Sequence, residues 1–216
     1  MLTFAIGDIH GCDEKLGMLL TACRDFSSRR PSRYVFVGDY LDRGANSRAV
    51  IERVLELQRQ GPSVIALMGN HEEMLLNALH SGDALEQWRS NGGGETLRSY
   101  GVDATSDLPA QHVNWLGSLP DRFDDGRRLF VHAGIRPGVS IDAQTHHDLL
   151  WIREPFLSST AGHERFIVHG HTPLNSNFPD VHSNRVNLDT GAVYGGALCA
   201  AIFEDSQVAP IDFITI

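Results

Sequence analysis

The chain has 216 residues, of which 42% are hydrophobic, and it carries 18 Lys and Arg against 27 Asp and Glu, for a formal net charge of −9. This length predicts one globular domain with a substantial core. The negative charge argues against a nucleic-acid backbone or an anionic membrane as the main partner. The sequence has no run of 18 apolar residues and no secretory leader pattern, and its three cysteines lack metal or disulfide spacing. We therefore expect a cytoplasmic protein with reduced thiols.

The first 70 residues alternate between strand-like and helix-like segments. Three apolar runs, LTFAI, YVFV and VIALM, each lead into a polar loop: GDIHG, GDYLDRG and GNHE. The two segments between them place apolar side chains on one helical face: Leu16, Leu19, Leu20 and Cys23 in the first, and Val50, Ile51, Val54 and Leu55 in the second. This β-α-β-α-β order predicts parallel strands, whose carboxyl ends bring the three loops to one edge of a sheet.

The second half of the chain has a different pattern. Residues 72 to 125 contain mixed helical fragments, the stretch SNGGGETLRSYG and two punctuating prolines, which predict a mainly helical insertion over the loops. The strand-like runs RRLFVHAG, ERFIVHGHT, RVNLDTGAVYGG and ALCAAIFED follow and predict a second sheet. The fold class is therefore α/β, as a single domain over residues 1 to 216.

Side chains with chemistry gather at the predicted strand ends: Asp8, His10, Asp39, Asp42, Arg43, Asn70, His71, His132, His169 and His171. Carboxylate, imidazole and amide oxygen form a mixed ligand set that suits Mn, Fe or Zn better than Ca. Two ions about 3.5–4 Å apart need a bridging ligand, and a carboxylate serves best. Asp39, after the middle strand, is the candidate bridge.

Each motif alone has an ordinary explanation. Gly-Asp after a strand is often only a turn, and a lone histidine on an apolar strand is more often a core residue than a ligand. Turn chemistry alone does not readily explain five such motifs in order. Each of them brings metal-compatible side chains to the same face. We therefore favour a metal centre.

Together, GDIHG, GDYLDRG, GNHE, HAG and GHT resemble the phosphoprotein phosphatase branch of the dinuclear metallophosphoesterases, and DTGAVYGG extends the resemblance to residue 196. The short length and the NGGGETLRSYG segment resemble the small bacterial and phage members. The resemblance implies a β-sandwich of two mixed sheets flanked by helices. It also implies two divalent metal ions per chain, which we expect to be Mn²⁺, with Fe or Zn as alternatives.

The resemblance also implies roles for individual residues. One metal would be held by Asp8, His10 and Asp39, and the other by Asp39, Asn70, His132 and His171. A metal-bridging hydroxide would attack the phosphorus, while His71, oriented by Asp42, would protonate the leaving alkoxide. Arg43, Arg153 and Asn70 would bind the phosphate, although an ion pair with a neighbouring aspartate is the simpler reading of Arg43. We assign no definite role to His169 or Asp189.

These roles predict a serine/threonine protein phosphatase whose partner is a phosphorylated protein or peptide, with no obligate subunit. Two alternatives remain. A hydrolase of symmetrical dinucleoside tetraphosphates shares the metal centre, but in that branch the aspartate of DRG is usually replaced and GNHE commonly reads GNHD, whereas Asp42 and Glu72 match the protein phosphatases. A non-catalytic binding module would be expected to lose a ligand or the acid, and this chain has kept them all.

Overall fold

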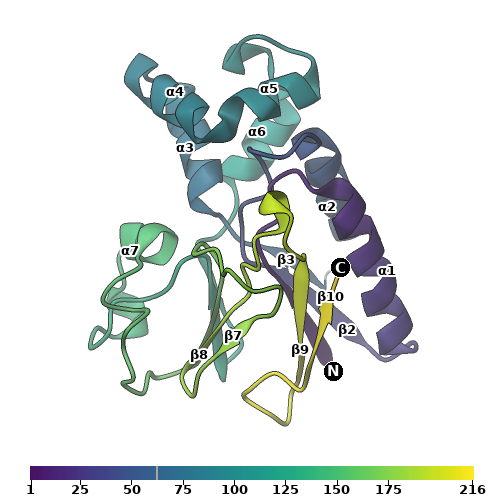
Figure 1. Cartoon of the computed structure of the whole chain (residues 1–216), viewed down its shortest axis with the longest axis vertical. Helices are drawn as coiled ribbons and strands as arrows, with labels where there is room; N and C mark the ends of the chain where they lie inside the picture. The colour runs from purple at the N-terminus through teal and green to yellow at the C-terminus, as the bar shows by residue number, and fades with distance from the viewer. Residues whose placement is uncertain (62) are drawn as a thin grey trace.

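Two five-stranded mixed sheets form the centre of the molecule in a computed structural model that describes residues 1–61 and 63–216 (Figure 1). The first sheet has the order β10 (Asp212–Thr215), β9 (Cys199–Glu204), β1 (Leu2–Ile6), β2 (Ser32–Phe36) and β3 (Val64–Ala66). The second has the order β4 (Arg122–Asp124), β5 (Arg128–Val131), β6 (Phe166–His169), β8 (Arg185–Asn187) and β7 (Asp180–Val181). The predicted α/β class with two mixed sheets is confirmed.

The predicted β-α-β-α-β start is present. Strand β1 pairs in parallel with β2, and β2 with β3, through α1 (Asp13–Ser27) and α2 (Ser47–Gln60). The predicted apolar face of α1 is buried, and on α2 Val50, Ile51 and Val54 are buried while Leu55 is half-buried. Both helices cover the outer face of the first sheet, on the right of Figure 1. The three loops therefore emerge at one edge, as the connection rule requires.

Alternating side chains of the first sheet divide the core in two. Phe4 and Ile6 of β1 face the helices, whereas Ala5 faces the second sheet. Phe130 and Val168 of the second sheet meet Ala5 there. Because successive side chains of a strand point to opposite faces, the central strand is apolar at nearly every position.

One strand lies in a different sheet from the one expected. The run ALCAAIFED forms β9, which pairs antiparallel with β1 in the first sheet, and β10, which the sequence analysis did not predict, forms the edge beside it. Both faces of β9 are buried, with Ala201 toward the second sheet and Ile202 toward the helices. Apolar spacing indicates a strand buried on both faces but does not say which neighbour it pairs with.

The predicted insertion is mainly helical and gathers at one end of the molecule, at the top of Figure 1. Its helices are α3 (Asn70–Ala78), α4 (Gly82–Trp88), a π-helical turn (Arg89–Gly93), α5 (Gly94–Tyr100), a 3₁₀ turn (Thr105–Asp107) and α6 (Ala110–Gly117). The insertion ends before the predicted residue 125, because β4 already belongs to the second sheet.

Short helical elements complete the fold: 3₁₀ turns at Ile141–Ala143 and Ala192–Tyr194, and α7 (His146–Trp151) beside the second sheet. Among the described residues, no helix combines the length and the apolar character needed to cross a membrane.

Candidate active site

The site lies where the carboxyl ends of parallel strands from both sheets meet. The predicted side chains follow those strands directly: Asp8 and His10 after β1, Asp39 after β2, Asn70 after β3, His132 after β5, and His171 after β6. All six are buried. The fold therefore brings together ligands that are up to 163 positions apart in the sequence.

Asp39 lies at the centre of this cluster. Its Oδ2 is 3.2 Å from His10 Nε2, and its Oδ1 is 3.5 Å from His132 Nε2. Burial pushes its pKa upward, but His132, His71 and His10 outweigh burial and hold the pKa well below its usual range. An ionised carboxylate whose two oxygens face different histidines has the geometry that a bridge between two cations requires.

On one side of Asp39, three acceptor atoms converge. His132 donates its Nδ1 proton to the carbonyl of Val37 (2.9 Å), which leaves the lone pair of Nε2 facing the site. This Nε2 is 2.8 Å from Asn70 Oδ1 and 3.2 Å from His171 Nδ1, and the latter is 2.9 Å from Asn70 Oδ1. Burial lowers the pKa of His132, and burial together with His132 lowers that of His171 to about 2. Neutral imidazoles and an amide oxygen at these separations fit a divalent cation.

On the other side of Asp39, Asp8 and His10 converge. His10 donates from Nδ1 to the carbonyl of Leu41 (2.8 Å), which turns Nε2 toward Asp39. Asp8 accepts the backbone proton of His171 (3.0 Å). Burial raises the pKa of Asp8 well above its usual value, and Asp189 and Asp39 raise it further. A second cation would offset this crowding of negative charge.

Metal-compatible atoms lie close enough for two ions. One atom each from Asp8, Asp39 and His132 lies within 4.8 Å of the others, and the same holds for His10, Asp39 and His71. The predicted ligands thus fit a dinuclear centre, and their individual assignments stay a prediction. His71 also lies within reach of this centre, although the sequence analysis gives it a different role.

His71 and Asp42 form a buried pair beside the cluster. Nδ1 of His71 is 2.7 Å from Asp42 Oδ2, and both side chains are almost completely inaccessible. The other ring nitrogen, Nε2, has no hydrogen-bond partner among the described residues. A histidine held by a carboxylate at one nitrogen with the other free is arranged to transfer a proton.

The backbone around the site is strained. Five of the seven non-glycine residues with positive φ in the described part of the chain belong to the predicted site: His10, Asp39, Asp42, Arg43 and His171. Left-handed backbone is unfavourable for such residues and persists only where surrounding contacts enforce it. The strand-end loops therefore hold conformations that aim ligands inward.

Glu72 provides one of those contacts. Its carboxylate accepts backbone protons from Asp39 (2.9 Å), Tyr40 (2.9 Å) and Gly69 (2.8 Å). It thereby ties the loop after β2 to the loop after β3. This is a physical reason for glutamate in GNHE, because a shorter side chain would not span both loops.

Arg43 does not form the ion pair considered as its simpler reading: none of the ion pairs among the described residues involves it, and its Nη1 lies 2.6 Å from His10 Nε2. A cavity of about 260 Å³ opens beside it, lined by Asp39, Arg43, Asn70, Asn91, Trp151, Arg153, His171, Pro173 and Tyr194. The two predicted phosphate-binding arginines thus border one cavity that also contains metal-ligand candidates.

The sequence analysis missed the two aromatic residues in that cavity. Trp151 donates from its indole to Glu73 (2.6 Å) and packs edge-on against His171. Tyr194 is 63% exposed and lies under the Arg43 guanidinium. The loop that carries Tyr194 is tied to α1 by Lys15, whose Nζ donates to the carbonyls of Ala192 and Gly196. Arg153 and the stretch DTGAVYGG were singled out in the sequence, but nothing there indicated that the aromatic residues Trp151 and Tyr194 face the site.

The two residues without a predicted role lie around the centre. Asp189 is buried, accepts a backbone proton from Gly191 (3.1 Å), and contributes to the raised pKa of Asp8. His169 is packed edge-on against Phe156, and burial lowers its pKa to about 3. His169 is therefore a neutral core residue.

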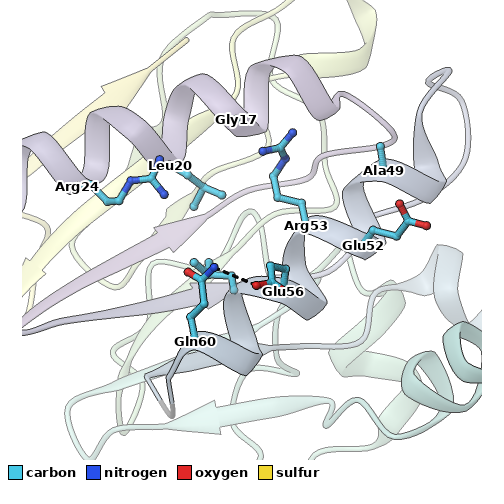
Figure 2. Close-up of a pocket in the computed structure, with 9 residues that line it drawn as sticks. Gly17, Leu20, Arg24, Ala49, Glu52, Arg53, Glu56 and Gln60 are labelled. Carbon is cyan, nitrogen blue, oxygen red and sulfur yellow. Dashed lines mark hydrogen bonds between the residues drawn. The ribbon is translucent and has the colours of Figure 1, made fainter.

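A groove of about 360 Å³ lies elsewhere, between α1 and α2 (Figure 2). Its charges of opposite sign compensate one another, and Arg53 is paired with Asp13 (2.6 Å). None of the predicted site residues lines it, so we do not connect it with the chemistry.

A family model of calcineurin-like phosphoesterases matches residues 1–203. The chain belongs to this family. Its members use a dinuclear metal centre, in agreement with the donor atoms around Asp39. The family resemblance inferred from the motifs is thereby confirmed, and the protein is a metallophosphoesterase.

Its relatives act on different phosphate compounds. Serine/threonine-protein phosphatase 1 of Salmonella typhimurium is 32% identical over 212 residues, covering 92% of this chain and 90% of the relative. A symmetrical bis(5′-nucleosyl)-tetraphosphatase of Paracidovorax citrulli is 37% identical over 151 residues, covering 68% of this chain but only 49% of the relative. An asymmetrical bis(5′-nucleosyl)-tetraphosphatase of Anoxybacillus flavithermus is 27% identical, covering 98% and 94%.

Solved structures share the fold. A cold-active protein tyrosine phosphatase matches with a TM-score of 0.71 at 19% identity, covering 96% of this chain and 75% of that chain. The family is thus established, and the substrate within it has to be argued from the site.

We predict that Asp39→Asn weakens both metal sites together, because the amide removes the charge and one anionic oxygen that both ions would share. After reconstitution with Mn²⁺ and gel filtration, elemental analysis should fall from about two ions per chain to well under one. Asp142→Asn, which alters a fully exposed carboxylate, is the matched control and should keep both ions. Full retention of one ion in Asp39→Asn would show that Asp39 is not shared.

Proposed function

We propose that the protein is a metal-dependent phosphomonoesterase that removes phosphate from phosphoserine and phosphothreonine in proteins or peptides. The observation that supports this most strongly is the buried His71–Asp42 pair with its free Nε2. A serine or threonine alkoxide is a poor leaving group and has to be protonated as it departs. A fixed proton donor at the metal cluster meets that requirement.

The chain's own residues divide the work of hydrolysis. Arg43 and Arg153 bind the phosphate oxygens through their planar guanidinium groups, and Asn70 assists at the edge of the metal cluster. As the bond from phosphorus to the leaving oxygen breaks, His71 gives its Nε2 proton to that oxygen. Asp42 Oδ2 faces the other ring nitrogen, Nδ1, and holds the ring so that Nε2 can face the leaving oxygen.

Asp8, His10 and Asp39 would hold one metal ion, and Asp39, Asn70, His132 and His171 would hold the other. Three of these candidates, Asp39, Asn70 and His171, line the cavity that the two arginines border. When bound, two divalent cations, which we expect to be Mn²⁺, supply Lewis-acid stabilisation of the phosphoryl oxygens and lower the pKa of the attacking water. Phosphoryl transfer needs little covalent chemistry from the protein, so positioning and charge account for most of the catalysis.

Hydrolysis of dinucleoside tetraphosphates is the second candidate. The tetraphosphatase relatives favour it, and the exposed Tyr194 ring beside Arg43 offers a surface on which a base could stack. A nucleotide leaving group, however, needs less protonation than an alkoxide. The complete acid pair therefore favours the ester, and its presence with every ligand candidate also speaks against a non-catalytic module.

The substrate assignment predicts a preference that can be measured directly. The chelator-stripped, Mn-reconstituted protein should show a higher kcat/KM on a phosphoserine or phosphothreonine peptide than on a symmetrical dinucleoside tetraphosphate. The opposite preference would keep the metal centre but make the protein a nucleotide hydrolase. Heat-denatured protein with the same metal content serves as the control.

The acid role of His71 predicts a dependence on the leaving group. His71→Asn should lower kcat on a phosphoserine peptide by roughly 10²–10⁴-fold, the usual contribution of a general acid. The loss on p-nitrophenyl phosphate should be much smaller, because nitrophenolate departs without a proton. His147→Asn changes a histidine that packs on Trp151 outside the cluster and is the control. Equal losses on the two substrates would argue against His71 as the acid.

A further inference from the structure

The helical insertion contacts the turn that carries Asp42, and we infer that two of its side chains, Trp88 and Thr96, are positioning residues that hold Asp42, and through it the proton donor His71. Trp88 ends α4, and Thr96 lies in the first turn of α5. This inference rests on the proposed function, because it concerns the acid assigned there to His71. Neither residue lies in a motif by which the metal cluster was found.

Three side-chain donors surround the Asp42 carboxylate. Its Oδ2 accepts from Trp88 Nε1 (2.8 Å) and faces His71 Nδ1 (2.7 Å), and its Oδ1 accepts from Thr96 Oγ1 (2.6 Å). Asp42, Trp88 and Thr96 are all completely buried. Because an indole nitrogen can only donate, Oδ2 is an acceptor, and the carboxylate cannot rotate without losing a buried hydrogen bond.

Thr96 contacts both the backbone and the carboxylate of Asp42. Its Oγ1 accepts the backbone proton of Asp42 (2.9 Å), which Ser47 Oγ also approaches (3.0 Å). The Thr96 hydroxyl lies closer to Asp42 Oδ1 (2.6 Å) than to Ser47 Oγ (3.2 Å), so Asp42 is its nearer acceptor. The same residue therefore holds both the backbone and the side chain of Asp42. This matters because Asp42 and Arg43 have φ of 71° and 68°, a left-handed backbone that depends on external contacts.

The NGGG stretch makes room for these contacts. A Cβ at Gly93 would clash with the indole ring of Trp88, although φ of Gly93 is −61° and suits any residue. The carbonyl of neighbouring Gly92 accepts the backbone proton of Arg43 (3.2 Å). The stretch thus lets the indole reach Asp42 and fastens the turn at the same time.

The geometry has a consequence for catalysis. The ring of His71 is oriented at Nδ1 by Asp42 alone among the described side chains, and Nε2 has no partner of its own to hold it. If Asp42 turns, Nε2 moves away from the leaving oxygen while the metal ligands stay in place. Loss of Trp88 or Thr96 should therefore damage proton donation and spare metal binding.

The test compares leaving groups in the Mn-loaded, full-length protein. Trp88→Phe removes the indole hydrogen bond to Asp42, and Thr96→Val removes both hydrogen bonds that the Thr96 hydroxyl makes with Asp42. Both variants keep the approximate shape of the side chain. Each should lower kcat on a phosphoserine peptide by about tenfold or more, a part of what the general acid supplies, and change kcat on p-nitrophenyl phosphate by less than about threefold. KM on both substrates and the metal content should remain those of the unchanged protein.

Three further variants make the result specific. Trp115, in another helix of the insertion, donates an indole hydrogen bond to Gln58 of α2. Trp115→Phe removes that bond and should not change the ratio of kcat on the phosphoserine peptide to kcat on p-nitrophenyl phosphate. Thr96→Ser keeps the hydroxyl and should restore that ratio. Gly93→Ala should displace the indole ring of Trp88 and so change kcat on the two substrates as Trp88→Phe does. It is the second test if Trp88→Phe or Thr96→Val does not fold and loses its metal.

The outcomes separate this inference from the proposed function. The positioning role is wrong if Trp88→Phe and Thr96→Val lower kcat equally on both substrates, or do not lower it at all. If His71→Asn is selective for the poor leaving group while these variants are not, only the positioning role fails. If His71→Asn is itself unselective, the acid assignment fails and the positioning role fails with it.

Discussion

The arrangement of this protein depends on the crowding of buried acceptor atoms around Asp39. The Asp39 carboxylate, the amide oxygen of Asn70 and imidazole nitrogens of His10, His132 and His171 are separated from their neighbours by 2.8 to 3.5 Å. An oxygen of a second carboxylate, Asp8, lies within 4.8 Å of Asp39 and His132. Burying such groups together is unfavourable unless cations compensate them. The surrounding fold is arranged to enforce this proximity, with ligands on strand ends from both sheets and backbones in left-handed conformations. Metal binding is therefore built into the architecture.

The glycines of the motifs follow from the same constraint. A Cβ at Gly170 would clash with the carboxylate of Asp8, and one at Gly69 would clash with that of Asp39. The ligand carboxylates pack directly against backbone from neighbouring loops. The pairs Gly69-Asn70 and Gly170-His171 thus combine a ligand candidate with the space that another ligand candidate needs.

How much could be predicted from sequence depended on whether the signal was local. Alternating strands and helices at the start form a local pattern, and the parallel strands were predicted correctly. Ligand types at the strand ends are also a local pattern. The structure brings these side chains together around Asp39, and their roles as metal ligands stay a prediction. The pairing of β9 with β1 joins residues about 200 positions apart, and no local pattern specified it. No local pattern specified the contacts of Trp88 and Thr96 with Asp42 either. In the sequence both are ordinary helix residues, and only the folded insertion brings them to Asp42. Tyr194 and Trp151 were not predicted because no periodic pattern in the sequence shows whether an aromatic side chain faces a cavity.

The site divides into two parts with different origins in the fold. Segments that follow strands of both sheets carry the metal-ligand candidates, whereas the later part of the insertion contacts Asp42 through Trp88 and Thr96 and borders the cavity through Asn91. Such a division is consistent with relatives whose names describe a protein phosphatase and dinucleoside tetraphosphatases. We expect changes in this part of the insertion to alter the setting of His71 and Asp42 and to leave the ligand candidates in place.

A crystal structure of the Mn-loaded protein with anomalous scattering data would test the dinuclear centre most directly. We expect two anomalous peaks about 3.5–4 Å apart, both in contact with the carboxylate of Asp39. One should lie beside Asp8 and His10, and the other beside Asn70, His132 and His171. A single peak, or two peaks of which only one contacts Asp39, would contradict the dinuclear centre on which the proposed chemistry depends.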